Sequence, residues 1–299
     1  MGVKVSVVEM ISRILPYEDS EMASKLETML KQEGIEIYTN TTVKAINEKG
    51  STKVVTFGEK EAGVDLVLVA LGRMERKTAW VLQLDILPYD KALRLQEELV
   101  SKRREGNIRD LLILLEHPPV VTVTREKTRE NIIVPLDKVA KEGIAIAKTN
   151  RGGDVTYHGP GQLVGYLIMD LNHYGNDLHK YVHNIETIII NLLKDYNITA
   201  YRDSHYPGVW VNDEKIAAIG IAVKPKWIAM HGFSLNVNPN LDHFSLIFPC
   251  GIRNKKVTSL TKVLGKAVDK KELCQRLICH FSNVFNLKTE EIPLEDMVW

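Results

Sequence analysis

The sequence predicts a protein of mixed α-helices and β-strands that is organised in two parts. Strand, helix and strand patterns follow one another near the N-terminus. A polar stretch, Arg73–Ala79, separates two apolar strand patterns and marks the expected boundary. From about Trp80 onward, long amphipathic helices are interleaved with short strands. At 299 residues the chain is long enough for two domains.

The N-terminal part carries the pattern of a βαβ unit. Residues 2–9 are rich in valine and predict a strand, and residues 19–32 predict an amphipathic helix. Gly34 is expected to follow the end of this helix, where glycine is common. Ile35–Tyr38 predicts the second strand, so the order matches a βαβ unit. The apolar face of the helix is expected to carry Met22, Leu26, Met29 and Leu30.

The remaining elements are predicted from the period of their apolar residues. Two of them belong to the N-terminal part: a polar hairpin around Asn47–Thr52 and an apolar strand at Asp65–Leu71. The second part is expected to contain a helix at Tyr89–Arg104, a buried strand at Leu111–Leu115, a helix at His179–Lys194, several strands between Val209 and Val237, and a helix at 269–285.

Composition and charge exclude several classes of protein. Hydrophobic residues make up 44% of the chain and charged residues 26%, which is ordinary for a globular protein. A net charge of +1 gives no electrostatic reason to expect a nucleic acid or an anionic membrane as partner. The three cysteines are too few for a disulfide framework and favour a reducing compartment. No apolar run has the length of a membrane span, and no signal-peptide pattern is present, so a cytoplasmic protein is expected.

The run from Arg151 to Gln162 is the most informative segment for function. Its glycines and its proline exclude a regular helix or a central strand. Glycine lets the backbone approach a ligand closely, and Arg151, Thr156, Tyr157 and His158 add polar side chains to the same loop. A nucleotide loop is not favoured, because the spacing differs from G-x-G-x-x-G and no Gly-Lys-Ser/Thr ending follows. The alternative is a glycine-rich turn with an incidental histidine.

A cysteine and a lysine further along form the second candidate pair. Cys250 stands between Pro249 and Gly251, which places it on a tight turn, and Lys215 begins an otherwise apolar strand. A nearby ammonium turns a thiol into a nucleophilic thiolate. The residues alone leave two alternatives open, an inert buried thiol and a solvated lysine. Cys274 and Cys279 lie on an amphipathic helix and are expected to pack in the core; without ligand pairs at zinc spacing, no metal site is expected.

Several motifs in a consistent order give residues 80–299 a close resemblance to the lipoyl(octanoyl) transferases. The segments that carry the resemblance are Leu115–Pro119, Arg151–Gln162, Pro207–Val211, Lys215–Ile221, His231–Asn238, Pro249–Ile252 and Thr258–Leu260. The resemblance implies an α+β fold with a mixed sheet, shared with biotin and lipoate protein ligases, over residues 79–299. One motif differs: members usually have Thr-x-Gly-Arg where this chain has Thr122-Val123-Thr124-Arg125.

The resemblance also implies the roles of particular residues. Cys250 would form an acyl-thioester, and Lys215 would lower the pKa of that cysteine. The residues implied to line the acyl site are Arg151, Gly152, Gly153, Asp154, Val155, Thr156, Tyr157, His158, Ala218, Ile219, Gly220, Gly232, Phe233 and Ser234. No cofactor and no metal are implied.

The implied activity is an acyl transfer, the first step of endogenous protein lipoylation. An octanoyl group would pass from an octanoyl-acyl carrier protein through Cys250 to a lysine of a lipoyl domain. The acceptors would be the lipoyl domains of 2-oxoacid dehydrogenase complexes or the glycine cleavage H protein. The alternatives are an ATP-dependent lipoate-protein ligase, a non-catalytic lipoyl-domain binding protein and a cysteine hydrolase.

The N-terminal part resembles a different family. Residues 2–73 are similar to part of the NAD-binding domain of dihydrolipoamide dehydrogenases, through the strand ending in Glu9, the Ile14–Pro16 and Asp19 positions, and Val67–Arg73. The glycine-rich turn that would cradle a pyrophosphate is absent, although Glu9 would lie where a ribose binds. We therefore interpret residues 1–75 as a truncated, Rossmann-like βαβ fragment and expect neither NAD nor FAD binding. Saturable NADH binding in calorimetry would contradict this expectation.

Overall fold

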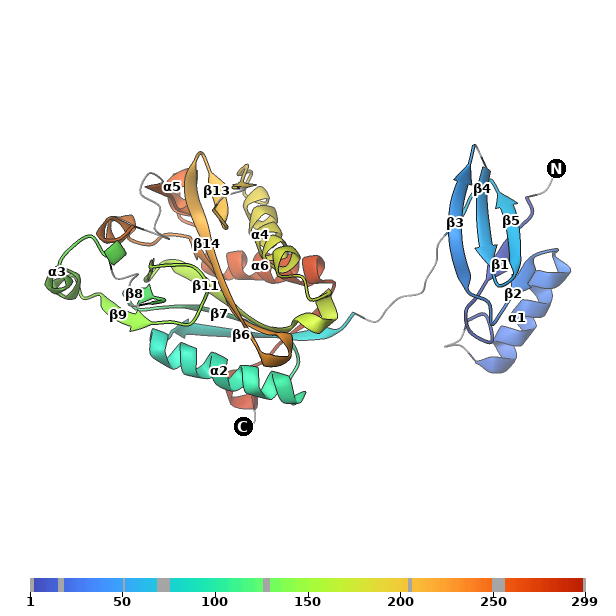
Figure 1. Ribbon diagram of the computed structural model, residues 1–299, viewed down its shortest axis with the longest axis horizontal. Helices are drawn as coiled ribbons and strands as arrows, with labels where there is room; N and C mark the ends of the chain where they lie inside the picture. Colours follow the sequence, from blue (N-terminus) through green and yellow to red (C-terminus); the bar gives the residue numbers. More distant parts are fainter. Residues whose placement is uncertain are drawn as a thin grey trace. The chain divides into compact units, whose positions relative to one another are not determined.

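The computed structural model describes residues 3–15, 19–50, 52–68, 76–125, 130–203, 206–248 and 256–297. The chain divides into two compact units, Met1–Met74 and Glu75–Trp299, drawn in Figure 1. The dividing point falls inside the polar stretch Arg73–Ala79.

The first unit begins with the expected βαβ arrangement. Strands β1 (Ser6–Val8) and β2 (Glu36–Tyr38) pair in parallel, and helix α1 (Ser20–Gln32) connects them. Asp19 starts the helix, because its carboxylate accepts the N–H groups of Glu21 and Met22. Gly34 follows its end with a left-handed φ of +87°, which glycine adopts without strain. The predictions of this helix and of the βαβ unit are confirmed.

The rest of the first unit is an antiparallel meander. It contains β3 (Val43–Lys49), β4 (Thr52–Phe57) and β5 (Lys60–Val64), and the β3–β4 turn confirms the hairpin predicted around Asn47–Thr52. The strand predicted at Asp65–Leu71 is wrong over residues 65–68, and residues 69–71 lie outside the described part. Leu66 and Leu68 are exposed, since no described strand pairs with this segment.

Within the described residues of the first unit, no segment covers the apolar face of helix α1. Met22 and Met29 are 65% and 61% exposed, and Leu26 is exposed as well. Only Ala23 among the α1 residues is buried. The apolar spacing therefore predicted the helix correctly, although this spacing alone does not say whether another segment covers the face.

The second unit is built on a large mixed sheet, with nine strands among the described residues. The order is β12-β13-β14-β15-β11-β7-β6-β17, and β16 also pairs with β14. β6 pairs in parallel with β7 and β17, and β14 with β16, whereas the other pairs are antiparallel. The strands are β6 (Thr78–Ile86), β7 (Leu111–Glu116), β11 (Gln162–Asp170), β12 (Tyr201–Arg202), β13 (Val209–Val211), β14 (Glu214–Lys224), β15 (Ile228–Asn236), β16 (Lys256–Val257) and β17 (Lys288–Glu291).

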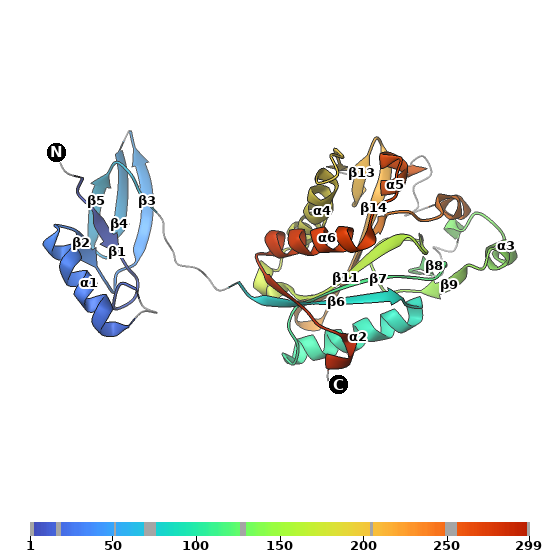
Figure 2. The same cartoon turned by 180° about the vertical axis from the view of Figure 1, so that it is seen from behind.

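Helices cover both faces of this sheet. Helix α2 (Tyr89–Glu105) lies on one side, and α4 (Leu178–Lys194) with α6 (Lys270–Phe285) lies on the other (Figures 1 and 2). Leu112 and Leu114 of β7 pack toward α4 and α6, whereas Leu111, Ile113 and Leu115 pack toward α2. Burial on both faces explains the continuous leucine-rich run predicted as a buried strand.

The predicted helices of the second unit are confirmed to within a residue or two at each end. Asp177 caps α4 and Asp269 caps α6 by accepting backbone N–H groups. On α6, Cys274 is buried as predicted, but Cys279 is exposed, so its predicted core position is wrong. Five residues along a helix amount to about 140° of rotation beyond a full turn, which places the two cysteines on different faces.

A small sheet positions the glycine-rich run beside the large one. Its order is β10 (Thr156–His158), β8 (Val120–Val123) and β9 (Ala145–Lys148). The short helices α3 (Leu136–Lys141) and α5 (Leu260–Leu264) complete the unit. Within the described residues, no helix is both long and apolar enough to cross a bilayer.

Candidate active site

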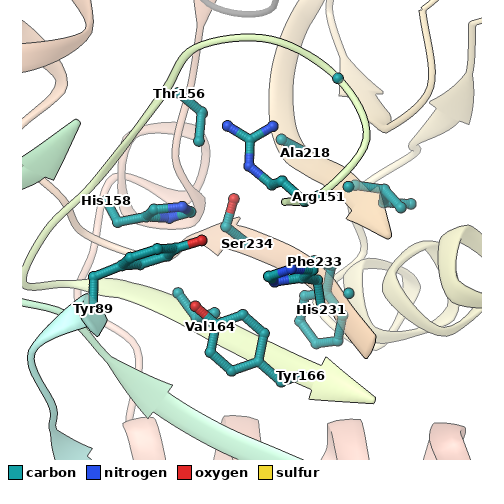
Figure 3. A pocket seen from close by; sticks show the side chains of 14 residues that line it. Tyr89, Arg151, Thr156, His158, Val164, Tyr166, Ala218, His231, Phe233 and Ser234 are labelled. Carbon is teal, nitrogen blue, oxygen red and sulfur yellow. The ribbon is translucent and has the colours of Figure 1, made fainter. Parts of the chain in front are cut away.

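A small pocket lies where β11, β14 and β15 meet the start of α2 and the loop between β9 and β10. Figure 3 shows side chains from these elements pointing into a common space. The cavity measures about 40 Å³. It is lined by Tyr89, Arg151, Gly153, Thr156, His158, Val164, Tyr166, Ala218, Ile219, Gly220, His231, Gly232, Phe233 and Ser234.

Three glycines let the Arg151–Asp154 loop lie directly on strand β14. The Gly152 N–H donates to Ile221 O at 2.7 Å. A Cβ on Gly220 would lie 3.0 Å from Gly152 O, so a side chain there would push the loop away. Gly153 has a φ of +91°, which favours glycine at this position. The glycines thus bring the loop backbone close to the strand and form one wall of the pocket.

The guanidinium of Arg151 holds its own loop in shape. It donates to the backbone oxygens of Gly152 at 3.0 Å and Asp154 at 2.6 Å. It also donates to Thr122 Oγ1 at 2.9 Å, which connects the loop to β8. Arg151 therefore has a structural role in the pocket wall in addition to any contact with a substrate.

Thr124, the residue that differs from the related motif, also contacts this loop. Its hydroxyl donates to Gly153 O at 3.1 Å. We expect Thr124→Gly to lower the free energy of unfolding by about 1 kcal/mol, through the lost hydrogen bond and the added backbone freedom. Chemical denaturation measures this change. Unchanged stability together with unchanged KM would show that the Thr124 hydroxyl does not support the loop.

Side chains along β10 alternate in direction, so only some residues of the Arg151–His158 run face the pocket. Thr156 and His158 face the pocket. Val155 and Tyr157 point the other way into an apolar cluster, and the Tyr157 hydroxyl meets His243 Nδ1 at 2.7 Å. Asp154 accepts hydrogen bonds from Asn131 and from its own neighbour's N–H. The structure thus brings only part of this run to the pocket, together with the 218–220 and 232–234 triplets.

His158, which lines the pocket, and His117, which contacts the His158 ring, are held in defined tautomers. His158 Nδ1–H donates to Gln162 Oε1 at 2.7 Å, which leaves Nε2 as a bare acceptor. His117 Nδ1–H donates to Leu87 O at 2.6 Å, and its Nε2 accepts from the Tyr166 hydroxyl at 2.7 Å. The ring of Tyr89 stacks on that of His158 at a centroid distance of 6.0 Å. These contacts fix the orientation of His158.

His231 occupies an unusual backbone position in the middle of β15. Its φ is +62°, which is rare for a residue with a side chain and is often found at functional sites. The backbone N–H donates to the buried Gln96 side chain at 2.9 Å. Nε2–H donates to Asn150 Oδ1 at 2.7 Å, and the buried Nδ1 atom has no hydrogen-bond partner in the described structure. A bare nitrogen acceptor is therefore held at the pocket.

Burial keeps all three imidazoles neutral at physiological pH. Desolvation lowers the pKa of His117 to about 4 and that of His231 to about 3. Burial, with the neighbouring His117, also holds the pKa of His158 well below its usual range. These groups act as neutral hydrogen-bonding groups, and their low pKa values make them weak general bases.

This burial predicts acid sensitivity of the second unit. From pH 6.5 downward the unfolded chain takes up a proton at His117, whereas the folded imidazole resists protonation until about pH 4. Above pH 6.5 the burial of neutral His117 does not lower the free energy of unfolding. As the pH falls from 6.5 toward 4, the free energy of unfolding decreases by about 3 kcal/mol through this group. Thermal unfolding between pH 4 and 7 should show a shallower decline in His117→Asn, which can keep the bond to Leu87 O. Equal declines would contradict this account.

Lys215 lies at the start of β14, on the strand that also carries Ala218–Gly220. Its side chain is buried, and Nζ donates to Pro207 O at 3.1 Å. The ammonium lies 4.8 Å from the centre of the Trp210 ring, a favourable cation–π distance. Cys250 lies outside the described residues. The chain that follows it returns as β16, where Lys256 pairs with Glu214 and Val257 pairs with Lys215.

Sequence reasoning did not include several of the residues at the pocket. Tyr89 and Tyr166 reach it from the first residue of α2 and from β11. Val164 lies on β11 as well, and its hydrophobic character was typical of any buried strand. His231, in contrast, lies in the His231–Asn238 motif that the sequence analysis had already singled out.

Comparison with known proteins identifies the family to which this fold and site belong. A model described as the lipoyl protein ligase A/B catalytic domain matches residues 88–282, so the chain belongs to this family. An octanoyltransferase of Desulforamulus reducens is 49% identical over 214 residues, which cover 71% of this chain and 93% of that protein. An octanoyltransferase of Caldicellulosiruptor saccharolyticus is 49% identical over 219 residues, covering 73% and 93%. The chain is therefore an acyltransferase of the octanoyltransferase kind.

Solved structures agree with this fold. A lipoate-protein ligase A bound with ATP gives a TM-score of 0.59 at 21% identity, over 74% of this chain and 90% of that chain. A bipartite lipoate protein ligase from Thermoplasma acidophilum, solved in work that includes its E2 lipoyl domain, gives 0.58 at 20% identity, over 74% and 88%. These matches confirm the expected α+β fold with a mixed sheet.

The N-terminal segment matches a separate family model. Residues 1–91 match the model described as pyridine nucleotide-disulphide oxidoreductase. This agrees with the resemblance of residues 2–73 to a dihydrolipoamide dehydrogenase fragment.

Proposed function

We propose that the second unit transfers an octanoyl group from an octanoyl-acyl carrier protein to a lysine of a lipoyl domain, through a thioester on Cys250. Residues 79–299 form the catalytic domain in this proposal, and residues 1–75, which resemble part of an NAD-binding domain, take no part in the chemistry. The acceptors are lipoyl domains of 2-oxoacid dehydrogenase complexes or the glycine cleavage H protein. The reaction takes place in the cytoplasm.

The observation that carries the proposal is the convergence of distant motifs at one pocket. The glycine-rich loop, the 218–220 triplet and the 232–234 triplet line the same cavity. Lys215 lies on the strand of the first triplet, and the chain beyond Cys250 pairs with that lysine through β16. A thiol in this surrounding would have both an ammonium to stabilise its thiolate and an acyl site within reach.

The first half-reaction forms the enzyme thioester. The Cys250 thiolate attacks the octanoyl carbonyl, the carbon–sulfur bond to the carrier breaks, and the carrier thiolate leaves with a proton. One thioester replaces another, so the step is close to neutral in energy and needs no ATP. The cavity beside the Arg151–Asp154 loop is the proposed site of the octanoyl chain, and Val164 and Phe233 supply apolar lining.

The second half-reaction forms an amide. The neutral lysine amine of the acceptor attacks the Cys250 thioester, the carbon–sulfur bond breaks, and the amine loses a proton. His158 and His231 are poor bases because burial depresses their pKa values. We assign both proton transfers to Lys215: its ammonium gives a proton to the departing carrier thiolate in the first half-reaction, and the resulting neutral amine accepts the proton of the acceptor lysine in the second. The neutral histidines orient the substrate as hydrogen-bond acceptors.

The ATP requirement separates this function from that of a lipoate ligase. Purified protein is incubated with octanoyl-acyl carrier protein and an apo lipoyl domain, and in parallel with free octanoate, each with and without MgATP. The proposal predicts modified lipoyl domain from the carrier substrate without ATP, and none from free octanoate. Modification that depends on ATP and free octanoate would assign the protein to the ligases instead. Lack of modification in every mixture would favour a non-catalytic binding protein.

A further inference from the structure

A buried carboxylate on helix α4 lies close to the Lys215 site without touching the lysine. Glu186 is 5% exposed, although it is a charged residue. Arg202 Nε donates to its Oε2 at 3.0 Å, and His183 Nδ1 lies 3.9 Å from the same oxygen. Burying a carboxylate is costly unless it is paired and hydrogen-bonded. The Arg202 pair supplies one partner, and a backbone group supplies the other.

That backbone group belongs to the peptide that also binds Lys215. The Gly208 N–H donates to Glu186 Oε1 at 3.0 Å. The carbonyl of the same peptide, Pro207 O, accepts from Lys215 Nζ at 3.1 Å. The N–H and C=O of a trans peptide lie in one plane and point in opposite directions. This peptide therefore contacts Glu186 at one edge and Lys215 at the opposite edge. A carboxylate at the N–H polarises the peptide and makes its carbonyl a stronger acceptor for an ammonium.

The backbone geometry at Gly208 maintains this bridge. Its φ of +132° lies in the region that favours glycine, and a Cβ there would lie 2.5 Å from Ala217 O. The peptide therefore lies directly against β14, at the strand that carries Lys215. Any side chain at this position would displace the peptide and with it the acceptor of the lysine.

We propose that Glu186 is a positioning residue for Lys215 and acts through the Pro207–Gly208 peptide. This inference rests on the proposed pairing of Lys215 with Cys250. The charged and titratable groups that face the bridge are Glu186 and His183 from α4, Arg202 from β12 and Lys215 from β14. Glu186 holds Pro207 O in place and polarises it. The carbonyl then stabilises the Lys215 side chain as an ammonium and fixes its position. This ammonium in turn stabilises the thiolate of Cys250.

The test is a double-mutant cycle on the reactivity of Cys250. The alkylation rate of Cys250 by iodoacetamide, followed by peptide mass spectrometry, is measured from pH 5 to 10. The variants are wild type, Glu186→Gln, Lys215→Met and the double variant. Gln keeps an oxygen for the Gly208 N–H but removes the charge. We expect Glu186→Gln to raise the midpoint of the Cys250 alkylation profile by about one pH unit, which gives about tenfold less thiolate at low pH. The remaining thiolate is more nucleophilic, so the alkylation rate at low pH falls by only about threefold.

The expected result is this shift for Glu186→Gln in the wild-type background and no further shift when Lys215 is already Met. An equal shift in both backgrounds would show a general structural effect and overturn the inference. A shift for Lys215→Met but none for Glu186→Gln would also overturn it and leave the proposed function intact. If the alkylation profile of Lys215→Met equals that of the wild type, the proposed pairing of Cys250 with Lys215 is itself contradicted.

Two further variants support this test, one as a substitute in case of a folding defect and one as a matched control. Glu186→Gln leaves Arg202 without its carboxylate, so Glu186→Gln/Arg202→Gln removes both charges and replaces the single change if that variant does not fold. Glu272→Gln removes a helix carboxylate paired with Arg276 at 2.6 Å, away from the bridge. Its alkylation profile should match that of the wild type.

Discussion

Cys250→Ala is expected to abolish octanoyl transfer, with a loss of about 10⁴-fold or more. The proposed mechanism passes the acyl group through this sulfur, and removal of a covalent nucleophile leaves only the contribution of substrate binding. Initial rates of lipoyl-domain modification measure the loss. Binding of the apo lipoyl domain, followed by calorimetry, should be unchanged.

Another thiol of the same chain supplies the control for this prediction. Cys279 is exposed on α6, and Cys279→Ser should retain full activity. Cys250→Ser with appreciable residual transfer would contradict a thioester intermediate, because a serine hydroxyl is a far weaker nucleophile at neutral pH than a cysteine with its thiolate fraction.

Lys215→Met is expected to reduce transfer by about 10²–10³-fold. Without the ammonium, the thiolate fraction of Cys250 falls at pH 7, and the second half-reaction loses its proton acceptor. The pH profile of kcat/KM should shift to higher pH by one unit or more. Rapid-mixing measurements of thioester formation and discharge separate the two effects.

Lys215→Arg distinguishes the two roles assigned to the lysine. Arginine keeps the positive charge but does not give up its proton in this pH range. Thioester formation should therefore be restored more than thioester discharge. Equal restoration of both steps would contradict the role of Lys215 in proton transfer.

The sequence predicted those elements whose local pattern and packing agree. Helix α4 combined an apolar stripe with Asp177 as its cap, and β7 showed the uninterrupted apolar run of a strand buried on both faces. The exposure of the α1 face and the absence of a strand at residues 65–68 depend on whether a partner segment is present. An apolar pattern carries no information on that point.

The sequence motifs of the candidate site could be predicted, but not every residue that lines the pocket. Glycines and a histidine marked the Arg151–His158 run, but the burial of Tyr157 away from the pocket follows from the pleat of β10 against its neighbours. Tyr166 reaches the pocket through the register of β11. Glu186 appeared as an ordinary polar position on a helix, because its contact with the Pro207–Gly208 peptide arises only in the folded chain.

Intact-mass spectrometry of the protein after incubation with octanoyl-acyl carrier protein, without ATP, tests the central claim most directly. The account predicts one octanoyl adduct on the wild type, mapped to Cys250, sensitive to hydroxylamine and discharged by apo lipoyl domain. No adduct should form on Cys250→Ala. A lipoyl domain that becomes octanoylated while no adduct forms, or an adduct that apo lipoyl domain does not discharge, would contradict a thioester on Cys250 as the intermediate.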